Sequence, residues 1–134
     1  TRWMIAGSLA VLAGHLIIAF APMDVKAFGF IGIARLGLGY SLVPSAMWPS
    51  VPKIVPERNL GTAYSLIYWI QNMGMLLVPI FVGRIFKTSE GIVASGRAEV
   101  IFICLGVVAI LVAESLRRAS MKHPELRLDD PSNK

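Results

Sequence analysis

An arginine lies inside an apolar stretch of the chain. Residues 29–55 read GFIGIARLGLGYSLVPSAMWPSVPKIV, and Arg35 stands among glycine, leucine and isoleucine. An ionisable side chain in a membrane-length segment is costly unless it is paired or lines a polar pathway. A guanidinium can hold a carboxylate through two parallel hydrogen bonds. Arg35 therefore predicts a substrate-binding site for a carboxylate, or a pairing with an acid from other helices or with backbone carbonyls.

A polar face follows the segment 60–86. At about 100° per residue, a helix places one set of residues within a third of its circumference: Gly61, Tyr64, Tyr68, Gln71, Asn72, Met75 and Pro79. Hydroxyl and amide groups donate and accept hydrogen bonds, and tyrosine rings can hold an ammonium group. Tyr64, Tyr68, Gln71 and Asn72 are thus predicted to bind a polar solute. Hydrogen bonding between helices is the alternative.

The opposite face of the segment 60–86 is apolar. It carries Leu66, Ile70, Met73 and Leu77. We expect Ile70 and Leu77 to face lipid.

Three prolines fall late in the apolar stretch. Pro44, Pro49 and Pro52 each lack an amide donor, so each frees the carbonyl four residues earlier. Those carbonyls belong to Tyr40, Ser45 and Trp48. A bend or local unwinding is expected, either as a hinge or as a static kink.

The turn after the prolines carries opposite charges. Glu57 and Arg58 could form a gate that breaks and re-forms as the protein changes conformation. The alternative is that they are solvated residues that fix the topology. His15 could shuttle protons, although a histidine that faces a neighbouring helix is the simpler interpretation.

No catalytic or metal-binding motif is present. The sequence has no HExxH, no serine–histidine–aspartate set and no phosphate-binding glycine loop. Cys104 stands among apolar residues and reads as a packed hydrophobe. We expect no enzyme activity, no metal and no cofactor.

These residues must be positioned by membrane helices. Four apolar segments, 3–21, 28–55, 60–86 and 98–116, each approach the ~20 residues that span a bilayer. The fold class is therefore all-α membrane, with residues 1–116 as a four-helix transmembrane unit. Residues 117–134 read as a disordered cytoplasmic polar tail. Small residues at a spacing of four predict helix contacts: Ala6, Ala10 and Gly14 in the first span, and Gly37, Ser41 and Ser45 in the second.

The basic residues are unevenly distributed. Eight lysines and arginines fall on one side of a four-pass topology and four fall on the other. Arg35 lies inside a span and is left out of this count. The positive-inside rule places residues 1–2, 53–59 and 117–134 in the cytoplasm, and 22–27 and 87–99 outside. The net charge is +5. Because the basic residues flank apolar spans, we expect the lipid bilayer as a partner and no nucleic acid. The chain opens Thr-Arg-Trp and reads as a fragment of a longer protein.

Three stretches resemble the major facilitator superfamily. They are RLGLGYS at 35–41, PERNLGTA at 56–63 and GMLLVPIFVG at 74–83. The superfamily carries an arginine–glycine stretch in the fourth helix of each six-helix half and a glycine–proline stretch in the fifth. Leu38, Ser41, Val78 and Val82 depart from its usual glutamine and glycines.

A more specific resemblance covers residues 39–83. GYSL, AMWP, VPE, LGTAY and IQNMG, in that order, are similar to a branch of the superfamily that carries dipeptides. The resemblance implies that the spans are helices 9 to 12, part of the C-terminal half, with the missing N-terminal helices as partners. It also implies the cell membrane in a bacterium and the lysosomal membrane in an animal.

Three functions are open at this point. The first is secondary-active or facilitative transport of a small polar solute, such as a dipeptide, by alternating access. The second is proton-coupled antiport of drugs or organic ions. The third is a four-helix membrane scaffold protein that works by contacts alone.

Overall fold

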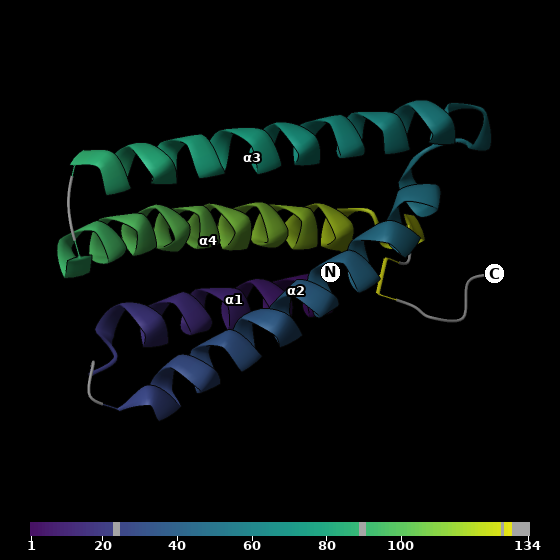
Figure 1. Ribbon diagram of the computed structural model, residues 1–134. Coiled ribbons are helices and arrows are strands. Elements are labelled where there is room, and N and C mark those ends of the chain that lie inside the picture. Colours follow the sequence, from purple (N-terminus) through teal and green to yellow (C-terminus); the bar gives the residue numbers. More distant parts are fainter. Residues whose placement is uncertain (23–24, 89–90, 127, 130–134) are drawn as a thin grey trace.

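The computed structural model describes residues 1–22, 25–88, 91–126 and 128–129. Four long helices follow one another, joined by short turns (Figure 1). They are α1 (Arg2–Phe20), α2 (Lys26–Ile54), α3 (Leu60–Thr88) and α4 (Gly91–Lys122), with 3₁₀ turns at Glu57–Asn59 and Pro124–Leu126. Each long helix is apolar and long enough to cross a membrane. The all-α membrane class is confirmed.

The helices follow the predicted spans except at the last one. α4 begins at Gly91 and continues to Lys122, so residues 117–122, predicted as disordered tail, are helical. Glu114 explains the extension, because it binds Arg117 at 2.7 Å and Arg118 at 2.9 Å one turn later. Pro124 cannot continue the helix. Residues 127 and 130–134 of the predicted tail lie outside the described residues.

α1 and α2 touch backbone to backbone through two reciprocal glycine pairs. A Cβ built on Gly39 would lie 2.7 Å from the carbonyl oxygen of Gly7, and one on Gly14 would lie 3.1 Å from that of Gly32. All four glycines are buried, and each helix repeats its glycine after two turns. Their missing side chains permit this close approach, which strengthens dispersion contacts between helices in lipid.

The predicted helix-contact faces are only partly correct. Gly14 lies in the contact, whereas Ala6, Gly37, Ser41 and Ser45 are exposed. The serines instead bond within α2, where Ser41 Oγ donates to Gly37 O at 2.9 Å and Ser45 Oγ to Ser41 O at 2.7 Å. A glycine repeat of seven residues, rather than small residues every four, sets the pairing in this antiparallel hairpin.

α3 is the most exposed helix. None of its residues is buried, and Figure 1 shows it at the edge of the bundle, beside α4. α4 in turn packs on α1, where a Cβ on Gly106 would lie 3.2 Å from Leu12 Cδ1. The apolar side chains of α3 therefore need lipid or further helices to cover them.

α2 runs without interruption through its prolines. It is helical from Lys26 to Ile54 with Pro44, Pro49 and Pro52 inside it, so local unwinding is not seen. Each proline removes one hydrogen bond, and the bonds of the neighbouring residues preserve the helix. Ser50 Oγ adds a bond to Ala46 O at 2.8 Å in the same region.

Successive helices run in opposite directions through the bundle. In Figure 1, the end of α1, the start of α2, the end of α3 and the start of α4 lie at one end of the bundle, and the α2–α3 turn lies at the other. In a Cys104→Ala background, a membrane-impermeant thiol reagent added outside is expected to label a cysteine at Thr88 and not one at Glu57. Permeabilised membranes provide the control, because both positions are exposed and should then react. Outside labelling of position 57 alone would invert the predicted topology.

Candidate functional site

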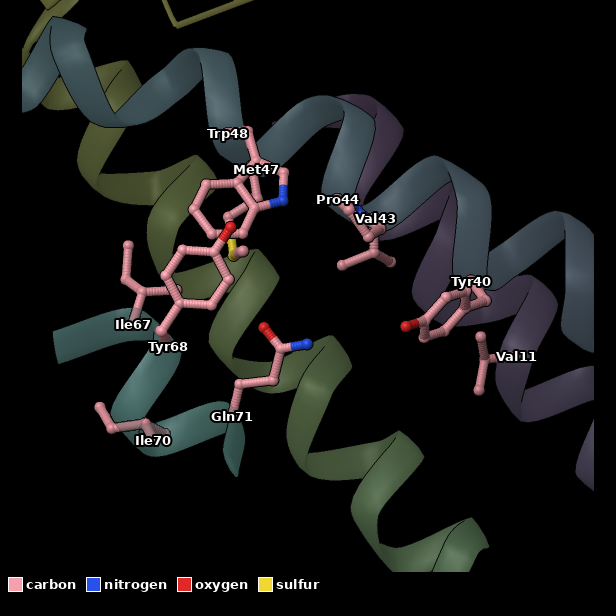
Figure 2. A pocket seen from close by; sticks show the side chains of 10 residues that line it. All are labelled: Val11, Tyr40, Val43, Pro44, Met47, Trp48, Ile67, Tyr68, Ile70 and Gln71. Atoms are coloured by element: carbon pink, nitrogen blue, oxygen red, sulfur yellow. The ribbon is translucent and has the colours of Figure 1, made fainter. Parts of the chain in front are cut away.

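A groove of about 710 Å³ lies between α2 and α3 (Figure 2). Its walls are mostly apolar, as is usual for ligand sites, with a few polar groups among them. The lining residues are Val11, Tyr40, Val43, Pro44, Met47, Trp48, Ile67, Tyr68, Ile70 and Gln71.

An aromatic cluster forms one wall of the groove. The Trp48 ring of α2 lies 5.0 Å from the Tyr68 ring and 5.4 Å from the Tyr64 ring of α3, tilted by 38° and 36°. Such aromatic pairs contribute about 0.5–1.5 kcal/mol each beyond the area that they bury. The cluster joins two helices that otherwise make few contacts, and Trp48 and Tyr68 line the groove.

Pro52 contributes to this cluster indirectly. Because Pro52 has no amide hydrogen, the carbonyl of Trp48 has no helical donor. The Tyr64 hydroxyl donates to that carbonyl in a long bond of 3.5 Å. One of the three carbonyls predicted to be free thus accepts a hydrogen bond from the neighbouring helix.

Two flexible polar groups enter the groove from opposite sides. Figure 2 shows the Tyr40 hydroxyl of α2 and the Gln71 amide of α3 directed into the same space. Together they offer donors and acceptors for a peptide or carboxylate, and the nearby rings can hold an ammonium group. The groove is chemically suited to a small polar solute that carries apolar parts.

The structure places some of the predicted binding residues at the groove and not others. Tyr68 and Gln71 line the groove. Tyr64 does not line it but packs against the ring of Trp48, which does. Asn72 does not line it, because its amide donates to the carbonyl of Tyr68 one turn earlier at 2.8 Å. Asn72 stands about 100° around the helix from Gln71.

The prediction for Ile70 is wrong in one respect. Ile70 lines the groove, although the projection placed it on the lipid side. The groove therefore extends further around α3 than a symmetric polar face would suggest, although no residue of α3 is buried. Leu77 is exposed and does not line this groove.

Arg35 lies away from the groove. It is exposed and has no hydrogen-bond or ion-pair partner among the residues that the structure describes. Successive residues turn by about 100°, so Tyr40 and Pro44 project from the other side of α2. The predicted partner of Arg35, a solute carboxylate or an acid, would have to approach from outside these four helices.

The predicted hinge and gate residues lie near one end of the bundle. Pro44 lines the groove, whereas Pro49 and Pro52 are exposed residues further along α2. Glu57 and Arg58 are exposed in the 3₁₀ turn that connects α2 to α3. Their movement and any gate that they form remain predictions.

Sequence reasoning missed Tyr40 and Trp48 as groove residues. Their signal was the spacing of Tyr40, Pro44 and Trp48, which repeats every four residues and marks one face of α2. Arg35 belongs to the other face of α2. In the described part of the chain, no cluster of histidine, cysteine or acidic residues could hold a metal ion.

Comparison with known proteins identifies relatives over most of the chain. The chain is 34% identical over 117 residues to the human protein named lysosomal dipeptide transporter MFSD1, which is 87% of this chain and 24% of that protein. The Bos taurus protein of the same name is 38% identical over 86 residues, or 64% of this chain and 18% of the relative. The Danio rerio protein is 32% identical over 113 residues, or 82% of this chain and 23% of the relative.

No family model and no solved structure matches the chain. The curated relatives are nevertheless consistent, since each carries the same name. Over most of its length the chain is similar to proteins of the major facilitator superfamily, a class of multi-pass membrane proteins. Within that superfamily, the proteins to which it is similar are the MFSD1 transporters, and it spans about a quarter or less of their length.

Proposed function

We propose that this chain is the part of a dipeptide transporter that contains helices 9 to 12, in the C-terminal half of a facilitator fold. The similarity to MFSD1 proteins carries this proposal, because they are named lysosomal dipeptide transporters. The lysosomal membrane is accordingly the proposed location. The rest of the transporter would supply the helices that cover α3 and approach Arg35.

The groove between α2 and α3 is proposed as part of the solute pathway. A dipeptide carries a peptide group, two termini and two side chains, so it needs both hydrogen-bonding and apolar surfaces. The groove offers Gln71 and Tyr40 for the first purpose, and Trp48, Tyr68 and Met47 for the second. Its volume of about 710 Å³ leaves room for a molecule of this size.

Alternating access is proposed as the mechanism of transport. Among the described residues, the aromatic cluster and the long Tyr64 hydrogen bond connect α2 to α3, and no residue of α3 is buried. An interface with few buried contacts can rearrange at low cost. The prolines of α2 would be the points at which that helix bends.

The test is transport by the full-length natural protein in liposomes. We expect saturable uptake of labelled alanyl-alanine that unlabelled dipeptides inhibit and free alanine does not. Dipeptide inside the vesicles should accelerate uptake, because a carrier returns faster when loaded. Uptake of drugs or organic ions only against a proton gradient would favour antiport instead. No transport of any solute would favour a scaffold protein.

Two adjacent amides allow a matched test of the groove. Gln71→Leu is expected to raise the KM for dipeptide about tenfold, because losing one hydrogen bond in a desolvated site costs about 1–3 kcal/mol. Asn72→Leu removes the same group from a residue that does not line the groove. It should change the KM less than about twofold, since its exposed bond within α3 is worth little.

The comparison is made at equal surface expression. An equal increase of the KM in both variants would count against the groove as the pathway. An increase for Asn72→Leu alone would support the original projection of the α3 polar face.

A further inference from the structure

His15 and Glu99 form an ion-pair contact between two helices that both cross the apolar region. His15 Nδ1 of α1 lies 2.8 Å from Glu99 Oε2 of α4, and the two side chains are only 15% and 18% exposed. The imidazole also stacks on Phe102 of α4, with centroids 4.9 Å apart and an interplanar angle of 8°. Distance, burial and stacking together fix the ring in one position.

This pair is separate from the proposed solute groove. Neither His15 nor Glu99 lines that groove. His15 lies about one and a half turns before the end of α1, and Glu99 about two turns after the start of α4. Both are therefore close to the end of the bundle at which α1 finishes.

A second hollow, of about 430 Å³, lies beside the imidazole. It lies between α1 and α2, and its lining residues include His15, Leu36 and Tyr40. Tyr40 is the titratable residue of α2 that lines this hollow together with His15. From α4 the ring meets Glu99, and Arg97 adds a positive charge two residues earlier.

The number of protons bound to His15 and Glu99 sets the net charge of this pair. With one proton shared between imidazole and carboxylate, the pair is neutral overall. When that proton leaves, a carboxylate charge remains in a poorly solvated place, which is unfavourable. The neutral ring can still donate Nδ1–H, but a charge-assisted hydrogen bond is roughly twice as strong as a neutral one.

We propose that His15 and Glu99 form a proton-binding site that ties α1 to α4 when it holds its proton and loosens this contact when the proton passes to water in the adjacent hollow. The ligand is the proton itself, and the imidazole and carboxylate are the groups that share it. We expect an acidic compartment on this side of the membrane to keep the site loaded.

The experiment is a double-mutant cycle on the full-length natural protein in nanodiscs of neutral lipid. The melting temperature is measured at pH 5.5 and pH 9.0 for wild type, His15→Gln, Glu99→Gln and the double variant. We expect a coupling between the two positions that is about twofold larger at pH 5.5 than at pH 9.0. This readout does not depend on transport, so it is independent of the proposed function.

The chain provides a matched control pair. His123 Nδ1 and Glu125 Oε1 are 2.9 Å apart, but their side chains are 62% and 65% exposed. A cycle of His123→Gln and Glu125→Gln should show no measurable coupling at either pH, because water screens exposed pairs. This control distinguishes an exposed histidine–glutamate pair from the mostly buried pair between α1 and α4.

His15→Lys covers the case in which the glutamine variants do not fold. Lysine keeps a positive charge up to about pH 10, so the melting temperature of this variant should lose the pH dependence contributed by His15. The proposal is wrong if His15→Lys retains the full pH response of wild type. It is also wrong if the cycle shows no coupling at pH 5.5, or equal coupling at both pH values.

Discussion

Gly39→Ala is expected to destabilise the protein strongly, whereas Gly37→Ala is expected to leave it as stable as wild type or slightly more so. A Cβ at Gly39 would lie 2.7 Å from Gly7 O and 2.8 Å from Val11 N, and both are backbone atoms that cannot rotate away. A Cβ at Gly37 meets nothing within 4 Å. The two substitutions add the same methyl group to the same helix.

The two substitutions are expected to change the stability of the protein in opposite directions. Overpacking of this kind costs about 1–3 kcal/mol or more, because α1 and α2 must move apart along their shared contact. Alanine is a better helix former than glycine by up to about 1 kcal/mol, so the substitution at the open position carries no penalty. Gly7→Ala should fall between them, since its shortest contact, 2.8 Å, is with the Val43 side chain.

The measurement is the melting temperature of the purified full-length protein, together with the fraction that elutes as a single species. Gly39→Ala should lower both, and Gly37→Ala should lower neither. If Gly39→Ala has the same melting temperature as wild type, the reciprocal glycine contact does not hold the α1–α2 hairpin together.

Arg35→Ala is expected to reduce kcat/KM for dipeptide about a hundredfold, and Arg35→Lys about tenfold. Removal of one partner from a desolvated charge pair costs about 3–5 kcal/mol, which is enough for the first effect. Lysine keeps the charge but lacks the planar fork that binds a carboxylate through two bonds. The partner would come from the solute or from helices outside this chain, because the described residues provide none.

Arg84→Ala is the charge-matched control. Arg84 is exposed in the last part of α3, and its removal should change kcat/KM less than about twofold. Normal transport by Arg35→Ala would refute a role in solute binding. Loss of expression in every Arg35 variant, lysine included, would assign it a structural role.

The number, order and approximate limits of the helices followed from the sequence. Long apolar runs separated by polar turns leave few alternatives in a bilayer, and α1 to α3 end within a few residues of the predicted limits. α4 was harder to delimit, because its ends are polar and are held by side-chain pairs such as Glu114 with Arg117. Hydropathy does not report such pairs.

The candidate site was less predictable than the fold. Tyr68 and Gln71, from the predicted polar face of α3, line the groove, and their role in solute binding stays a prediction. The shape of the groove depends on how α2 lies against α3. That placement follows from the α1–α2 glycine contact and the aromatic cluster, which are tertiary features. The His15–Glu99 contact joins residues 84 positions apart and could not be inferred from either segment alone.

The unequal burial of the helices has a consequence for biogenesis. α1 and α2 can complete their backbone contact once the ribosome has delivered residue 54, because every glycine in it lies on those two helices. α3 has no buried residue to retain it in this bundle. The nascent chain would therefore assemble a finished α1–α2 hairpin, whereas α3 would depend on the other helices of the transporter to cover it. A folding defect in those helices would leave the apolar side chains of α3 exposed to quality control.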